Sequence, residues 1–462
     1  MTSPFAFLDR PSNAAMLIDA GRERIWTQAD VAEAVDATAA QMSVGRREVV
    51  FCLCRIDLPS IIGYLGAIRA GHAVAMLDAA IPAVLTEALI ERYRPAFVLR
   101  TEGGEQPVVD PLQAEGPAPS EELAVLLSTS GTTGSPKLAR LSRRNIDAHS
   151  ASIVSYLGID ERERAIQSLP IHFSYGLSVL NTHLATGASV IVPQHSIMRP
   201  GFWEDAARWQ ATSFAGVPYS YAILHRAGLL QSALPSSLRT LTQSGGRLAP
   251  ETIVELHELM TSRDGRLFVM YGQTESTARM SYVPPDALPG KAHTVGIAIP
   301  DGQLSIRAGD RETRDPDVEG EVVYRGPNVM LGYAESREDL ELPDALDGVL
   351  HTGDLGMLDQ DGFLRLTGRT KRIAKVFGLR VNLDEIEAAV GAQGPVAAVD
   401  GGDRIVLWRV PDGITPADDL RRQLAARFGL KARAFAVRDV EELPLNGRGK
   451  VDYRTLAERS GD

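Results

Sequence analysis

The sequence predicts an α/β protein with a large N-terminal domain of stacked α/β sheets, a β-rich subdomain and a small α+β C-terminal domain. Three observations predict this succession of domains along the chain. Residues 1–240 alternate strand-like with helix-like segments, residues 295–370 carry short strands and turns, and residues 372–462 differ from the rest in charge balance. A chain of 462 residues is also long enough for two or three domains.

The alternation in the N-terminal part begins with a clear strand and helix pair. Residues 48–53 are strand-like, residues 58–70 show an apolar helical periodicity, and residues 73–77 are again strand-like. This βαβ rhythm implies parallel sheets whose faces are covered by helices. The Pro-, Asp- and Glu-rich residues 103–122 are expected to form a surface connection before a strand at residues 123–127.

The β-rich subdomain is predicted from short strand-like runs separated by turns, at residues 302–307, 320–325 and 362–366. We place the domain boundary after residue 371, giving domains 1–371 and 372–462. The second of these carries 15 basic and 14 acidic side chains, which leaves a charge of -12 on the first.

The C-terminal domain is expected to contain a helix over residues 383–390. Asn382 and Glu385 have the spacing of a capping box at its start. A helix of this kind fits the predicted α+β domain.

Composition and charge exclude several classes of function. A net charge of -11 argues against nucleic-acid binding, which needs a basic surface. No signal-like start and no apolar run long enough to cross a bilayer is seen, so we expect no membrane contact and a cytoplasmic location. Cys52 and Cys54 share one face of a strand and are expected to be core residues rather than metal or redox groups.

A loop rich in serine, threonine and glycine follows the strand at residues 123–127. It offers backbone N–H groups, hydroxyl donors and one lysine, which suit the phosphates of ATP. Lysine is scarce, with six lysines against 42 arginines, so a retained lysine suggests a specific need for a compact ammonium group. The loop is not a Walker A motif, because Pro136 replaces its second glycine and Leu138 its magnesium-binding hydroxyl residue. The predicted phosphate-binding residues are Ser128, Thr129, Ser130, Gly131, Thr132, Thr133, Gly134 and Lys137.

This loop resembles the phosphate loop of the adenylate-forming superfamily, which includes acyl-CoA synthetases, nonribosomal peptide adenylation domains and luciferases. Five further motifs follow in the order found in that family, so that the resemblance covers essentially the whole chain. They are residues 271–276 (YGQTES), 320–326 (GEVVYRG), 351–355 (HTGDL), 368–371 (GRTK) and 444–450 (PLNGRGK).

The resemblance implies a role for each matching residue in binding ATP and Mg²⁺. Tyr271 would stack on adenine, and Glu275 would hold the magnesium ion with Thr274 beside it. Asp354 would accept hydrogen bonds from the ribose hydroxyls, to which Arg369 would donate. The remaining residues implied at the nucleotide site are Gly245, Gly246, Gly272 and Gln273.

Lys450 resembles the catalytic lysine that the family's C-terminal domain brings into the site. It would bridge the acid oxygen and the α-phosphate, where negative charge builds up in the transition state. The family's C-terminal domain rotates after adenylation, so this domain is expected to be mobile. Arg372 stands at the hinge, where the family usually has Asp or Lys, and Leu383 stands where proline is common.

The resemblance also implies which residues line the acid pocket: His172, Phe173, Tyr175, Tyr219 and Ser244. Amino-acid-activating members place an aspartate in the segment that reads PIHFSY at residues 170–175, and this chain has none there. A free α-amino acid is therefore disfavoured. Aryl and aliphatic acids both stay open, and His172 is either a substrate contact or part of an aromatic gate.

The function that the resemblance implies is an AMP-forming ligase for a small-molecule acid. The acceptor would be the thiol of CoA or of the phosphopantetheine of a carrier protein supplied in trans. Two alternatives stay open: a ligase with an amine or other non-thiol acceptor, and a luciferase-like oxygenase, although the chain lacks a Ser-Lys-Leu end. A degenerate nucleotide-binding regulator is disfavoured by the complete motifs, and the sequence leaves the oligomeric state open.

Overall fold

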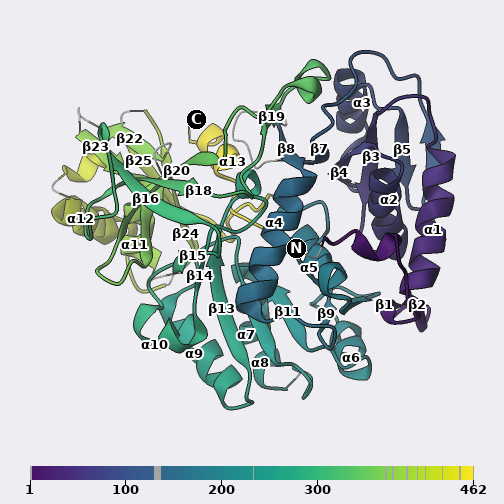
Figure 1. Cartoon of the computed structure of the whole chain (residues 1–462). Coiled ribbons are helices and arrows are strands. Elements are labelled where there is room, and N and C mark those ends of the chain that lie inside the picture. The colour runs from purple at the N-terminus through teal and green to yellow at the C-terminus, as the bar shows by residue number, and fades with distance from the viewer. Residues whose placement is uncertain are drawn as a thin grey trace. The chain divides into compact units, whose positions relative to one another are not determined.

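The computed structural model describes residues 3–128, 137–232, 234–369, 372–376, 379–391, 394–402, 404–411, 413–428, 430–446 and 449–460 (Figure 1). The chain separates into two compact units. The first consists of Met1–Leu304 and Tyr324–Leu350, and the second of Ser305–Val323 and His351–Asp462. The predicted boundary after residue 371 stays a prediction, because compactness alone does not show which part of the chain moves.

The first unit contains a seven-stranded sheet in the order β19-β8-β7-β4-β3-β5-β6. Its four inner strands β7, β4, β3 and β5 are parallel, and the strands toward the edges pair antiparallel. The strands are β3 Val49–Cys54, β4 Ala73–Asp78, β5 Phe97–Arg100, β6 Val108–Pro111, β7 Leu123–Ser128, β8 Leu138–Ser142 and β19 Gly332–Ala334.

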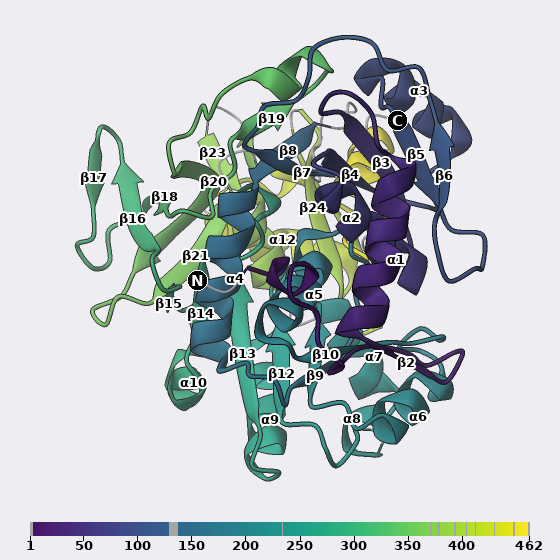
Figure 2. The same ribbon diagram turned by 45° about the vertical axis from the view of Figure 1, so that its right-hand side comes forward.

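Helices cover both faces of this sheet. On one face α1 (Gln28–Gln41) and α2 (Leu58–Arg69) lie side by side (Figure 2). Thr27 caps α1 by accepting the amide of Asp30, and Asp57 caps α2 by accepting that of Ser60. The other face is covered by α3 (Ala83–Tyr93), which contributes Leu89 and Tyr93 to a second core cluster.

A nine-stranded sheet also belongs to the first unit, in the order β15-β14-β13-β12-β11-β9-β10-β1-β2. The six strands from β13 to β1 are parallel, and β14, β15 and β2 are antiparallel at the edges. The strands are β1 Ala15–Asp19, β2 Arg24–Thr27, β9 Arg164–Ile166, β10 Ser189–Val192, β11 Ser213–Gly216, β12 Thr240–Gln243, β13 Arg266–Tyr271, β14 Ser281–Val283 and β15 Ile297–Ala298.

Two helices, α4 (Arg143–Leu157) and α5 (Ser174–Thr186), pack on one face of the nine-stranded sheet. Ser142 caps α4, with Asn145 completing a capping box. Further helices follow between the strands: α6 Pro200–Arg208, α7 Pro218–Arg226, α8 Leu229–Ser232, α9 Pro250–Thr261 and α10 Leu288–Lys291.

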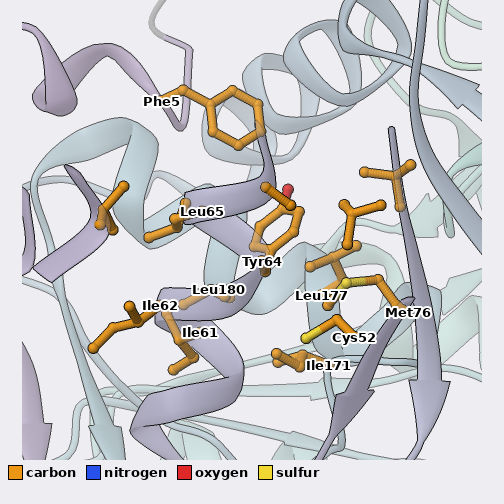
Figure 3. Packing of buried hydrophobic residues seen from close by; sticks show 14 of the residues in the cluster. Phe5, Cys52, Ile61, Ile62, Tyr64, Leu65, Met76, Ile171, Leu177 and Leu180 are labelled. Carbon is orange, nitrogen blue, oxygen red and sulfur yellow. The ribbon is translucent and has the colours of Figure 1, made fainter. Parts of the chain in front are cut away.

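The largest described core cluster joins the two sheets of the first unit through α2 and α5. Figure 3 shows Leu177 and Leu180 of α5 near Tyr64 of α2, with Cys52 and Met76 from the seven-stranded sheet in the same cluster. Cys52 and Cys54 are both buried and unbridged, which confirms the prediction that they are core residues. The same α5 also packs on the nine-stranded sheet, so its position is fixed from two sides.

The second unit contains most of a five-stranded sheet in the order β17-β16-β18-β20-β21, a β22/β23 hairpin, and a three-stranded sheet β24-β25-β26. Ile386 and Val390 of α11 pack with Leu420 and Leu424 of α12 in its core. The elements are β16 Gln303–Ala308, β17 Arg311–Thr313, β18 Gly320–Arg325, β20 Val349–Leu358, β21 Leu364–Arg369, β22 Ile373–Val376, β23 Leu379–Asn382, α11 Leu383–Val390, β24 Val396–Asp400, β25 Ile405–Arg409, α12 Ala417–Phe428, β26 Phe435–Asp439 and α13 Tyr453–Glu458.

The fold class predicted from the sequence is confirmed, with three local differences. Residues 103–122 are not wholly a connection, because β6 pairs there with the edge of the sheet. The strand expected at residues 362–366 begins later, at Leu364. Asn382 caps α11 by accepting the amide of Asp384, so the capping box predicted with Glu385 is wrong. Within the described residues, none of the helices has the length and apolar character needed to cross a membrane.

Candidate active site

The predicted phosphate loop connects two antiparallel strands of the first unit. Ser128 ends β7, and Lys137 lies directly before β8. The two strands stay paired up to the loop, with Ser128 opposite Leu138. The loop is therefore anchored at both ends by the sheet. Thr129, Ser130, Gly131, Thr132, Thr133 and Gly134 lie outside the described residues.

The lysine of this loop is connected to the predicted magnesium ligand through β19. Lys137 Nζ lies 2.5 Å from Glu335 Oε1 and 5.9 Å from the centre of the Tyr333 ring. The hydroxyl of Tyr333 donates to Glu275 Oε1 at 2.6 Å. Burial, and the negative charge of Glu275, raise the pKa of Tyr333, so the phenol keeps the proton that it donates.

Tyr333 and Glu335 were not predicted from the sequence. Their position follows from the pairing of β19 with β8, which sets Tyr333 opposite Ala139, two residues from Lys137. The only signal in the sequence is that residues 332–334 follow the 320–326 motif, and this does not identify the partner strand.

Tyr271, Gly272, Gln273, Thr274 and Glu275 lie where β13 ends and a short 3-10 helix, Thr274–Ser276, begins. The turn is tight: a Cβ atom on Gly272 would lie 1.9 Å from the carbonyl oxygen of Ala278. Glycine alone allows this approach. The chain then returns antiparallel beside β13 as β14, and Tyr271 itself is buried.

The return from this turn is strained. Thr277 and Ala278 both have positive φ, at 58° and 118°. For non-glycine residues such a backbone costs of order 1–3 kcal/mol each, and it persists only where the surroundings impose it. Strain of this kind is concentrated at functional sites.

The N-terminus of α5 meets the same turn. The hydroxyl oxygens of Ser174 and Thr274 lie 3.4 Å apart. His172 and Phe173, which precede the helix, form an edge-to-face pair with ring centres 4.1 Å apart. His172 is buried, and its Nε2 lies 3.8 Å from Asp78 Oδ2, a carboxylate that sequence reasoning did not identify. This geometry fits the packed aromatic alternative for His172.

Tyr175 is buried one residue into α5. Its hydroxyl oxygen lies 2.8 Å from that of Thr242, and the guanidinium carbon of Arg279 lies 4.8 Å from its ring centre. Burial raises the pKa of Tyr175, which keeps it a neutral hydrogen-bonding group. Arg279 was also missed by sequence reasoning.

Ser244, Gly245 and Gly246 follow the carboxyl end of β12, beside the end of β11. The amide of Ser244 donates to the carbonyl of Gly216, and Gly245 takes the left-handed conformation with φ of 86°. Tyr219, on α7, is exposed. The carboxyl ends of β11, β12 and β13 are therefore one edge at which predicted site residues are gathered, as expected for a parallel sheet.

In the second unit, the two residues predicted to hold ribose form an ion pair. Asp354 on β20 lies directly opposite Arg369 on β21, and Arg369 Nε is 2.8 Å from Asp354 Oδ1. Asp354 is 3% exposed, and its amide donates to the hydroxyl of Thr352. The pairing fixes the carboxylate, which could accept hydrogen bonds from a vicinal diol.

Lys450 lies directly before Val451, which forms an isolated antiparallel bridge with Leu445. Its amide donates to Asn446 Oδ1 at 3.1 Å, and its carbonyl accepts from the Asn446 amide at 2.7 Å. The side chain of Lys450 is exposed. These two contacts with Asn446 hold the backbone of Lys450.

The hinge candidate Arg372 is anchored in the second unit. Its guanidinium lies 2.5 Å from Asp384, 2.6 Å from Glu387 and 3.9 Å from the centre of the Tyr453 ring. The planar, forked guanidinium suits two carboxylates and an aromatic face at once better than the compact ammonium of lysine, and an aspartate would repel the carboxylates.

Glu275 fits a magnesium site that depends on its substrate. Among the described residues, no group of three or more His, Cys, Asp or Glu side chains could hold a metal by itself. Mg²⁺ is typically bound by one or two carboxylates together with substrate phosphates and water. A single carboxylate positioned by the Tyr333 hydroxyl agrees with that pattern.

Known proteins resemble the chain over most of its length. A family model described as AMP-binding enzyme matches residues 6–334. Isonitrile lipopeptide synthase from Streptomyces coeruleorubidus is 30% identical over 469 residues, which cover 92% of this chain and 31% of that protein. Oxalate–CoA ligase from Arabidopsis thaliana is 30% identical over 355 residues, covering 72% of this chain and 67% of that protein. The chain thus spans about a third of the first relative and two thirds of the second.

Solved structures confirm the fold. ATP-bound MatB from Rhodopseudomonas palustris matches with a TM-score of 0.80 at 23% identity, covering 100% of this chain and 99% of that one. O-succinylbenzoate CoA synthetase (MenE) from Bacillus subtilis, in complex with the acyl-adenylate OSB-AMP, matches with a TM-score of 0.79 at 21% identity, covering 99% and 98%.

Proposed function

On the premise that this chain belongs to the AMP-binding enzyme family and thus to the adenylate-forming superfamily, we propose that it is an AMP-forming acid–thiol ligase. It would convert an acid and ATP to acyl-AMP and pyrophosphate, and then pass the acyl group to a thiol. The observation that carries this proposal is the connection of Lys137, the phosphate-loop lysine, to Glu275, the metal-ligand candidate, through Tyr333.

In the first step, a carboxylate oxygen of the acid attacks the α-phosphorus of ATP. The bond from that phosphorus to the oxygen bridging the α- and β-phosphates breaks, and pyrophosphate leaves with the electron pair. Lys137 would orient the leaving group, and Lys450 would stabilise the charge that develops between the acid oxygen and the α-phosphate. Both would act as fixed positive charges and transfer no proton.

Glu275 would hold Mg²⁺, which neutralises phosphate charge when it is bound. Thr274 lies beside it, with Ser174 in hydrogen-bonding range, so the start of α5 positions the turn. Tyr271, Gly245, Gly246, Gly272 and Gln273 would surround the adenosine and the phosphates. Asp354, fixed by Arg369, would accept the ribose hydroxyls.

In the second step, a thiolate sulfur attacks the carbonyl carbon of acyl-AMP, and AMP leaves with the electron pair of the broken C–O bond. CoA is supported as the acceptor by relatives named oxalate–CoA ligase and sulfoacetate–CoA ligase. A carrier-protein thiol is the other acceptor that we propose to test, and a cytoplasmic location would supply ATP and CoA together. The C-terminal domain, residues 372–462, would move between the two steps.

The decisive experiment is pyrophosphate exchange into ATP over a panel of acids, followed by mass spectrometry of products with CoA, carrier protein and amines. We expect at least one acid to support exchange, and CoA or carrier protein to become acylated. Failure of every acid would contradict adenylation, and acylation of amines alone would contradict thiol transfer.

A further inference from the structure

A buried arginine of the first unit, Arg279, faces a cavity, and its guanidinium is not paired with a carboxylate among the described residues. Arg279 is 1% exposed, and its Nε and Nη1 atoms have no hydrogen-bond partner among the described residues. Among the described residues, its charged group lies against an aromatic ring, that of Tyr175, with 4.8 Å between the guanidinium carbon and the ring centre. Arginine stays charged at any pH that a protein tolerates, and a buried charge is costly unless an anion compensates it.

The cavity lies between α4, α5 and the strands β9, β11 and β12. The centres of water-sized groups can occupy about 30 Å³ of this cavity, which is room for about two such groups. That number matches the two oxygens of one carboxylate. Its lining combines apolar side chains such as Leu157, Val179 and Phe214 with polar ones, among them Thr242, His183 and Arg279.

Arg279 is the cation that would select which group occupies the cavity. His183 Nδ1 lies 2.8 Å from the carbonyl oxygen of Val179, and burial lowers the pKa of His183 to about 4. The imidazole is therefore neutral at pH 7. Glu163, the carboxylate in the lining, lies before β9 at the amino ends of the strands and accepts the hydroxyl of Thr212. Thr242 and Tyr175 lie toward the opposite, carboxyl ends.

The same segment that carries the metal-ligand candidate brings Arg279 into the cavity. Arg279 comes four residues after Glu275, beyond the strained pair Thr277 and Ala278. Its amide donates to His149 Nε2 at 3.1 Å, which fixes the backbone at that point. Tyr175, whose ring faces the guanidinium, follows Ser174, whose hydroxyl lies beside that of Thr274. Arg279, which lines the cavity, is thus connected through Tyr175 to the start of α5, where Ser174 lies beside the turn of the metal-ligand candidate.

We infer that Arg279 binds a second anionic group of the acid, so that the preferred substrates are short acids carrying a carboxylate or another oxyanion at the far end. This inference rests on the proposed adenylation. One acid group would react with ATP, and the other would form charge-assisted hydrogen bonds with Nε and Nη1 of Arg279. An acid whose far end is neutral would leave Nε and Nη1 of Arg279 buried without a hydrogen-bond acceptor among the described residues.

The test compares acids that differ only in the far group. Pyrophosphate exchange would be measured with malonate, succinate, glutarate and phthalate, each beside its monomethyl ester, and with 3-sulfopropanoate as the sulfonate arm. We expect at least one diacid to exceed its monoester in kcat/KM by about 100-fold or more, because a site built for hydrogen bonds strongly rejects an analogue that lacks them. Exchange with 3-sulfopropanoate would extend the class from carboxylates to other oxyanions.

Variants test the residue itself. Arg279→Met is expected to remove the preference for the diacid mainly through its KM, with the KM for ATP unchanged, and Arg279→Lys to restore part of it. Arg162→Met is the matched control, because the Arg162 side chain is 84% exposed and has no part in the proposed acid site. If Arg279→Met does not fold, as judged by thermal unfolding, the wild-type diacid-to-monoester ratio and Arg279→Lys decide.

The failures can be told apart. If the wild type uses monoesters as well as diacids, or if Arg279→Met keeps the preference, the inference is overturned while adenylation stands. If no acid of any kind supports exchange, the proposed function itself is overturned.

Discussion

Replacing Tyr333 by phenylalanine removes one hydroxyl and little else from the candidate site. That hydroxyl donates to Glu275 Oε1 at 2.6 Å, and the ring stays beside Lys137. Because the proposed role of Glu275 is to hold Mg²⁺, the donor should restrict the carboxylate to one orientation. Tyr333→Phe therefore tests whether β19 supports the proposed metal site.

The size of the effect follows from the contact. Removing a group that orients a metal ligand typically costs about 10–100-fold in metal affinity. Tyr333 is 40% exposed, so water can replace part of the lost hydrogen bond and the lower end is expected. We predict that the Mg²⁺ concentration for half-maximal exchange rises about 10-fold, equivalent to about 1.4 kcal/mol.

The assay is pyrophosphate exchange as a function of Mg²⁺, at saturating ATP and acid. Tyr64→Phe is the control, because it removes a buried hydroxyl that donates to Asn181 at 3.2 Å in the core. The control should lose about 1 kcal/mol of stability and keep its Mg²⁺ dependence. A wild-type Mg²⁺ curve for Tyr333→Phe would refute the reasoning and leave Tyr333 as a packing residue.

Three further predictions concern other groups. Lys450→Ala should abolish adenylation while ATP binding, measured by calorimetry, survives; adenylation at the wild-type rate would contradict its role. Asp354→Asn should raise the KM for ATP about 10-fold, since a charge-assisted hydrogen bond to ribose becomes neutral, and an unchanged KM would exclude the contact. Burial lowers the pKa of His183 to about 4 in the folded protein. As the pH drops from about 6.5 to 4, the imidazole is therefore protonated in the unfolded chain before it is protonated in the folded one. The free energy of unfolding then falls by up to about 1.4 kcal/mol per pH unit. Denaturant unfolding of the wild type and His183→Gln should differ in this slope, and equal slopes would reject the assignment.

Much of the fold could be predicted from local pattern. The helix Leu58–Arg69 and strands such as Ala73–Asp78 agree with the predicted segments to within a residue or two, because apolar periodicity reports which face is buried. The strand Val108–Pro111 was missed because an edge strand needs no apolar face, and its pairing comes from β5 rather than from its own residues.

The candidate site was predicted unevenly. Asp354 and Arg369 were both named, but only the register of β20 against β21 shows that they are paired. Tyr333 and Glu335 had no signal of their own, because their relation to Lys137 depends on which strand lies beside β8. Arg279 reads in the sequence as one more arginine among 42, and only burial without a partner distinguishes it.

The sequence by itself supplied the candidate site residues: a predicted phosphate loop ending at Lys137, residues 271–276, and a lysine at position 450 in a chain that otherwise prefers arginine. These are local statements, which residue type and spacing can carry. The tertiary structure decided which groups are partners, with Tyr333 supporting Glu275 and Arg279 facing a cavity. Strand pairing and burial depend on segments far apart in the chain, and no local pattern encodes which of them will meet.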